Sequence, residues 1–151
     1  MALRLHLLFC VCFFSATLSF AGLQLESKVV GTWKYDTKSI RVELSAESKA
    51  KFKKEPKKAQ AAINQMKGQM ATLIAPMTVM FNKDSSFLVF RGTQMEGLKG
   101  RWSIKGRSIR VVMDNAAQKV PELTLSSDGK RIQTAYRQAS FGVGRVDLVK
   151  K

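Results

Sequence analysis

The sequence predicts a mainly β protein, an up-and-down antiparallel β-barrel of about eight or nine strands with one helical insertion after the second strand. Three observations lead to this fold class. Short segments of alternating apolar and polar residues recur at regular spacing, which is typical of half-buried strands in barrels and sandwiches. Turn-forming residues separate most segments, so sequential hairpins are expected, and closure into a barrel removes exposed sheet edges. One block rich in Ala, Lys, Gln and Met interrupts the alternation and has the composition of helices.

Length and charge limit the function classes. The chain has 151 residues, which is enough for one domain with its own core and too few for two. Its formal net charge is +15 and its isoelectric point is about 10.2. A charge of this size predicts attraction to anionic partners such as nucleic acid, lipid head groups or acidic polysaccharide, and it carries no information about the fold.

Residues 1–21 have the pattern of a secretory signal peptide. Arg4 and His6 give a positive start, an apolar run over residues 7–14 follows, and small residues at Ser19 and Ala21 mark a cleavage site after Ala21. The apolar run is short for a membrane-spanning helix, which needs about 20 residues. We therefore expect an exported protein, periplasmic or extracellular, whose mature domain covers residues 22–151.

Cleavage after Ala21 would remove every cysteine and histidine of the chain, because Cys10, Cys12 and His6 all lie in the signal. The mature domain then has no disulfide, no cysteine nucleophile, no Ser-His-Asp triad and no usual zinc site. We expect a protein that is not an enzyme and that uses neither metal nor cofactor. The alternative is an unrecognised hydrolase with a Ser-Lys or carboxylate pair.

The nine expected strands follow one another with few interruptions. The first covers residues 29–36, and the second covers 40–44 after a turn at Asp36-Thr37-Lys38. Lys105-Gly106 and Asp128-Gly129 are predicted hairpin turns, and residues 92–97 are a predicted loop. The remaining strands are expected at residues 77–81, 87–91, 98–104, 109–113, 123–125, 132–136 and 142–149.

Residues 45–75 form the predicted helical insertion. Ser45 can cap a short helix over residues 46–54, and Pro56 is well placed to open a longer helix that Pro76 ends. An apolar stripe on the longer helix predicts a face docked on the barrel, with a mobile lid as the alternative. The stripe consists of Ala59, Ile63, Met66, Met70 and Leu73.

Gly31-Thr32-Trp33 resembles the Gly-x-Trp signature of lipocalin-like (calycin-type) proteins, in which the tryptophan closes the barrel floor. Residues 100–109 and 127–130 also look like hairpins of small exported bacterial lipocalin-like domains. The resemblance implies a barrel that holds a small apolar molecule, and an arginine of a late strand over the tryptophan. Arg137 and Arg145 are both candidates. The helical insertion departs from the family, whose helix normally lies near the C-terminal end.

One parity of the strands is expected to line the barrel, and hydroxyls of Tyr35 and Tyr136 could orient an apolar or amphipathic ligand. The alternative is a barrel filled by its own side chains. If Phe87 and Val89 face inward, Arg91 also enters the barrel, and its buried guanidinium then needs a carboxylate partner. If Leu88 and Phe90 face inward instead, Arg91 lies on the surface. The expected lining is Trp33, Tyr35, Val79, Phe81, Trp102, Ile104, Val111, Leu123, Leu125, Ile132 and Tyr136.

Six lysines near the start of the insertion give a second candidate function. They surround Phe52, and Glu55 is the only acid among them, so this helix could hold an anionic membrane surface or polysaccharide while the barrel serves as a scaffold. The alternative is a solvated helix face, and predicted export argues against nucleic acid as the partner. The lysines are Lys49, Lys51, Lys53, Lys54, Lys57 and Lys58.

Overall fold

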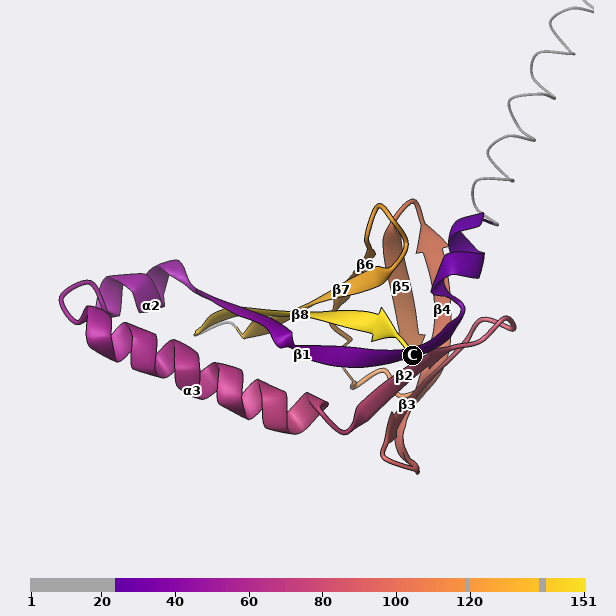
Figure 1. Ribbon diagram of the computed structural model, residues 1–151, viewed down its shortest axis with the longest axis horizontal. Coiled ribbons are helices and arrows are strands. Elements are labelled where there is room, and N and C mark those ends of the chain that lie inside the picture. The colour runs from indigo at the N-terminus through magenta and orange to yellow at the C-terminus, as the bar shows by residue number, and fades with distance from the viewer. Residues whose placement is uncertain (1–23, 119, 139–140) are drawn as a thin grey trace, which may run out of the picture.

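Eight antiparallel strands, paired in sequence order and closed by the pairing of β8 with β1, form a barrel (Figure 1). The computed structural model describes residues 24–118, 120–138 and 141–151, so the predicted signal and its cleavage site at Ala21 lie outside the described residues. The mainly β fold class is thereby confirmed. The strands are β1 (Gly31–Leu44), β2 (Met77–Phe81), β3 (Ser86–Arg91), β4 (Gln94–Lys105), β5 (Ser108–Met113), β6 (Glu122–Leu125), β7 (Arg131–Gln138) and β8 (Gly142–Lys150).

The first two predicted strands are one strand, β1, and the helical insertion therefore follows the first strand rather than the second. The predicted turn is an irregularity between Asp36 and Arg41 in the register of β1 with β8. Its local hydrogen bonds are those of a turn: the Lys38 amide donates to Asp36 Oδ1 at 3.1 Å, and Ser39 Oγ donates to the Asp36 carbonyl at 2.7 Å. The Asp147 amide of β8 donates to Ser39 Oγ at 2.8 Å, so the neighbouring strand holds β1 through the irregularity.

Large rings fill one end of the barrel, which we call the closed end. Trp33 is fully buried, and its indole Nε1 donates to the carbonyl of Val29 at 2.8 Å. The ring of Phe81 lies 5.3 Å from that of Phe87 and 5.6 Å from that of Trp102, centroid to centroid. The predicted burial of the tryptophan in the Gly-x-Trp sequence is therefore confirmed.

Both predicted hairpin turns lie at the closed end, with Gly106 between β4 and β5 and Gly129 between β6 and β7, each at positive φ. The loop predicted over residues 92–97 is shorter in the structure and covers only residues 92–93. β4 already begins at Gln94, because a register shift beside Val89 and Phe90 lets β3 and β4 continue pairing to the end of their hairpin.

An arm projects from the opposite, open end of the barrel (Figure 1). We define the arm as α2 (Ala46–Lys51), α3 (Pro56–Ile74) and the outer part of the β1–β8 ribbon, paired from Arg41↔Arg145 to Leu44↔Gly142. Ser45 caps α2 by accepting from the Ser48 amide at 3.1 Å, and Pro56 opens α3, both as predicted.

The apolar side of α3 packs against the ribbon. The helix is therefore docked, as predicted, but on the outer part of β1 and β8 rather than on the wall of the barrel. Ile40, Ile74 and Val146 form a small second core between them. Gly144 leaves room for α3, since a Cβ there would lie 2.6 Å from Met70 Sδ. The apolar stripe predicted for α3 was wrong at its last residue, because Leu73 is 55% exposed and Ile74 is buried instead. No described helix has both the length and the apolarity needed to cross a bilayer.

Candidate ligand-binding site

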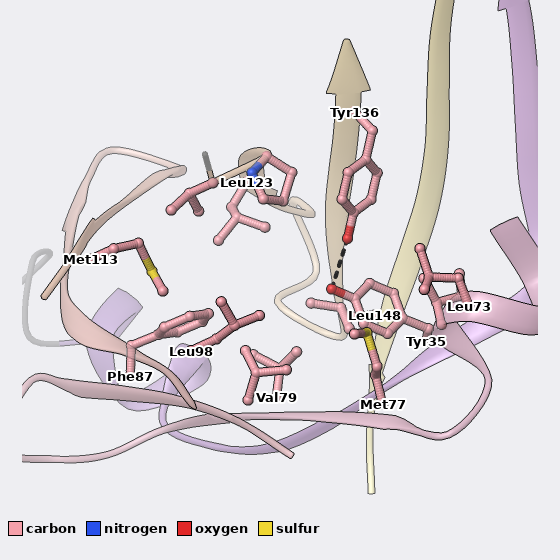
Figure 2. Close-up of a pocket in the computed structure, with 14 residues that line it drawn as sticks. Tyr35, Leu73, Met77, Val79, Phe87, Leu98, Met113, Leu123, Tyr136 and Leu148 are labelled. Atoms are coloured by element: carbon pink, nitrogen blue, oxygen red, sulfur yellow. Dashed lines mark hydrogen bonds between the residues drawn. The ribbon is translucent and has the colours of Figure 1, made fainter. Parts of the chain in front are cut away.

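A cavity of about 150 Å³ lies inside the open half of the barrel (Figure 2). Its inner walls are inward-facing side chains of the strands, mostly aliphatic, with the rings of Tyr35, Phe87 and Tyr136 among them. The end of α3, where Leu73 is 55% exposed, and the loop before β6 supply the rest of the lining, and we call this side of the cavity its mouth. The strands supply these side chains because alternate residues of a strand face the same side of the sheet. The lining comprises Tyr35, Leu73, Ile74, Met77, Val79, Phe87, Val89, Leu98, Met113, Val120, Pro121, Leu123, Tyr136 and Leu148.

Two tyrosines supply the only hydroxyl groups of this lining. Tyr35 on β1 and Tyr136 on β7 point toward one another, and their hydroxyl oxygens are 2.9 Å apart in a hydrogen bond (Figure 2). Burial raises the pKa of Tyr35 well above its ordinary value, and the neighbouring Tyr136 hydroxyl raises it further. Burial also raises the pKa of Tyr136, against hydrogen bonds that lower it. Both groups therefore stay protonated at neutral pH.

The chemistry of the lining favours an uncharged occupant. None of the lining side chains is ionisable at neutral pH, so a charged group inside would be desolvated without a counter-ion. One tyrosine hydroxyl donates to the other, and Thr134 is a second hydrogen-bond partner of Tyr136. A ligand hydroxyl would therefore donate to the remaining lone pairs of the pair, or a ligand oxygen would replace Thr134 as the partner of Tyr136. Among the described residues there is no group of three His, Cys, Asp or Glu side chains arranged to hold a metal ion.

The structure brings only part of the predicted ligand-binding set to the pocket. Tyr35, Val79 and Tyr136 line it. Trp33 and Phe81 are fully buried among the rings of the closed end and do not line the cavity. The barrel is thus filled at one end and hollow at the other, so each of the two sequence-based alternatives describes one half of it.

Trp102 and Arg91 lie outside the pocket for different reasons. Trp102 is buried at the closed end, where its Nε1 donates to the carbonyl of Asn82 at 3.0 Å. Phe87 and Val89 do face inward, the condition under which Arg91 was expected to enter the barrel. Arg91 is nevertheless exposed, because it is the last residue of β3 and lies at the rim.

Several lining residues were not predicted from the sequence. Met113 and Leu148 continue alternations that the sequence displays, so strand parity alone could have found them. Ile74 and Pro121 come from the helix end and from a loop, and their place at the mouth depends on long-range packing that no local pattern encodes.

A lysine, rather than either candidate arginine, covers the indole of Trp33. Lys150 Nζ lies 5.4 Å from the ring centroid and donates to the Lys28 carbonyl at 2.9 Å. Gly31 makes room for this chain: its φ of +138° favours glycine, and a Cβ there would lie 3.1 Å from Lys150 Cε. The two arginines instead pair with carboxylates on the outer face, Arg137 with Glu122 and Arg145 with Glu43.

The six predicted lysines gather at the far end of the arm, on α2, on the connection to α3 and on the first turn of α3 (Figure 1). Lys51 pairs with Glu47 at 2.7 Å and Lys58 with Glu55 at 2.9 Å, while the other four make no ion pair with any described residue. This group, which we call the lysine tip, is therefore separate from the pocket.

No protein-family model, curated protein or solved structure gives a significant match to the chain. The closed eight-stranded antiparallel barrel is compatible with a lipocalin-like fold. The pocket and the charged surface are therefore the features of this protein that bear on its function.

Proposed function

We propose that this protein is an exported, non-catalytic, lipocalin-like binding protein whose barrel holds a small uncharged amphipathic molecule. The observation that carries the proposal is the open-end cavity, whose apolar lining is interrupted only by the Tyr35–Tyr136 hydroxyl pair. Such a combination, mostly apolar walls with a few placed polar groups, is typical of small-molecule sites.

The cavity volume limits the buried part of the ligand. An apolar cavity of about 150 Å³ accommodates a molecule of about the size of benzene. A ring or a short alkyl segment therefore fits inside, and a longer ligand would extend through the mouth past Leu73 and Pro121. The tyrosine pair would bind a hydroxyl or carbonyl oxygen of the ligand, since it offers both a donor and an acceptor.

Titration with 1-hexanol, benzyl alcohol and hexanoate, followed by amide chemical shifts, tests this proposal. We expect both alcohols to shift the amides of β4, β6 and β7 at the open end, and hexanoate to bind more weakly because its charge has no partner inside. The substitution Leu98→Trp fills the cavity and should abolish binding. Val112→Trp is the matched control, because Val112 is 57% exposed on the adjacent strand and does not line the cavity.

The role of the hydroxyl pair is tested separately with Tyr136→Phe. A neutral hydrogen bond contributes about 0.5–1.5 kcal/mol, so the preference for benzyl alcohol over toluene should fall by about two- to twelvefold. Binding that is unchanged in Leu98→Trp, or hexanoate binding as tight as that of hexanol, would contradict the proposed site.

A further inference from the structure

We propose that the lysine tip docks this protein on an anionic phospholipid bilayer, with the mouth of the barrel pocket on the side of the molecule that faces the lipid. The first part concerns a surface separate from the pocket. The second part, the delivery of the pocket toward lipid, rests on the proposed ligand-binding function.

The charge of the tip is concentrated and largely unneutralised. Six lysines lie within ten residues, and four of them, Lys49, Lys53, Lys54 and Lys57, make no ion pair with described residues. The arginines of β7 and β8 differ, because Arg131, Arg137 and Arg145 each pair with a carboxylate at 2.9–3.2 Å. The tip charge is thus available to an external partner.

The form of the tip suits an extended flat surface better than a compact anion. Its ammonium groups lie on a short helix, a connection and the first turn of a second helix, and none of the six lysines lines the barrel cavity. The tip also contains no arginine, the residue that grips a single phosphate with two parallel hydrogen bonds. Anionic head groups in a bilayer attract such clustered lysines without any specific geometry.

The direction of the arm links the tip to the pocket. α3 begins at the tip with Pro56 and ends at the pocket with Ile74, and the arm leaves the barrel from its open end (Figure 1). A helix of 19 residues spans about 28 Å. Docking by the tip would therefore hold the pocket mouth roughly that far from the head groups, with Trp33 and Trp102 at the closed end farther away. The mouth would then face the bilayer, which is the source of an apolar ligand that partitions into lipid.

Co-sedimentation with vesicles tests the docking. Phosphatidylcholine vesicles with and without phosphatidylglycerol are compared at low and high salt, and we expect binding only with the anionic lipid and its loss at high salt. Replacing Lys49, Lys53, Lys54 and Lys57 by Gln should weaken binding several-hundred-fold, at about fivefold for each lysine near the surface. The matched control replaces Lys34, Lys105, Arg107 and Arg110 by Gln, which are exposed on the barrel, and it should lose far less.

A fluorescent reporter tests the orientation. Phe52→Trp introduces an indole at the tip, and brominated lipids should quench it on vesicle binding, whereas Trp33 and Trp102 in the unaltered protein should stay unquenched. Quenching of the closed-end indoles, equal losses in the two quadruple variants, or tighter binding to duplex DNA or heparin than to the vesicles would overturn the proposal. Failure of docking is distinguishable from failure of ligand binding, because the tip variant keeps the pocket intact and Leu98→Trp keeps the tip intact.

Discussion

The two ends of the barrel are built from the same eight strands but differ in packing, since side chains fill one end and leave a cavity at the other. At the closed end Trp33, Phe81 and Trp102 are buried in one cluster, in which the rings of Phe81 and Trp102 are in contact, and Lys150 extends over the indole of Trp33. At the open end most inward positions carry aliphatic side chains such as Val79 and Leu123, together with Tyr35 and Tyr136, and about 150 Å³ stays empty.

The difference shows that side-chain size, rather than strand number, decides whether such a barrel is hollow. An eight-stranded barrel has an interior that its own side chains can just fill. On β2 and β4 the buried rings of Phe81 and Trp102 fill it, whereas Val79 and Leu98, a few positions along, border the cavity. On β1 the ring of Tyr35 also borders the cavity, two residues after the buried Trp33. A stable base and a binding site can therefore coexist in one short chain.

The largest effect is expected at the closed end, from Trp33→Ala. Removal of a fully buried indole typically costs about 3–5 kcal/mol of unfolding free energy, measured by urea denaturation. The exposed neighbour Lys34 provides the control, because Lys34→Ala should change the unfolding free energy by less than about 0.5 kcal/mol. A loss of unfolding free energy below about 1 kcal/mol for Trp33→Ala would show that the indole is not a main packing element of the closed end.

A matched pair on β6 sharpens the comparison between the ends. Leu125 is fully buried at the closed end, and Leu123, two residues earlier on the same face, lines the cavity. Leu125→Ala should cost about 2–5 kcal/mol, and Leu123→Ala about 1 kcal/mol less, because a side chain beside empty space has fewer packing contacts to lose. Equal losses in urea denaturation would indicate that the open end is packed as tightly as the closed end.

The smallest effect concerns pH and the tyrosine pair. Both hydroxyls have raised pKa values in the folded protein, so above about pH 10 the unfolded chain loses protons that the folded chain keeps. This contribution to stability is present in full below about pH 10 and is lost as the pH rises through the folded pKa values. The double variant Tyr35→Phe/Tyr136→Phe should therefore lose less stability than the unaltered protein between neutral and alkaline pH.

Phenolate absorbance measures this directly, because the chain has only two tyrosines and both are in the pair. We expect absorbance to appear together with unfolding rather than before it. Tyrosines that ionise near pH 10 in a protein still folded by circular dichroism would contradict a buried pair.

Local patterns were sufficient to predict the barrel, the buried Trp33 and the helix starts at Ser45 and Pro56. They failed at Asp36, where the local hydrogen bonds are those of a turn although the strand continues. The chain stays extended there because β1 pairs with β8, more than a hundred residues away, on both sides of the irregularity. The pocket was predicted in part for a similar reason. Strand parity identifies which side chains face inward. Where along the barrel these side chains leave a cavity depends on how all eight strands are staggered, which parity does not give.

The continuity of β1 through the irregularity has a consequence for any attempt to shorten this protein. The strand carries the chain outward from Asp36 to Leu44, a distance of roughly 25 Å at strand spacing, and α3 is the return path to Met77. Excising only the helices would therefore leave two chain ends too far apart to rejoin. A clean deletion must also trim the outer ends of β1 and β8, after which a short hairpin can bridge what remains.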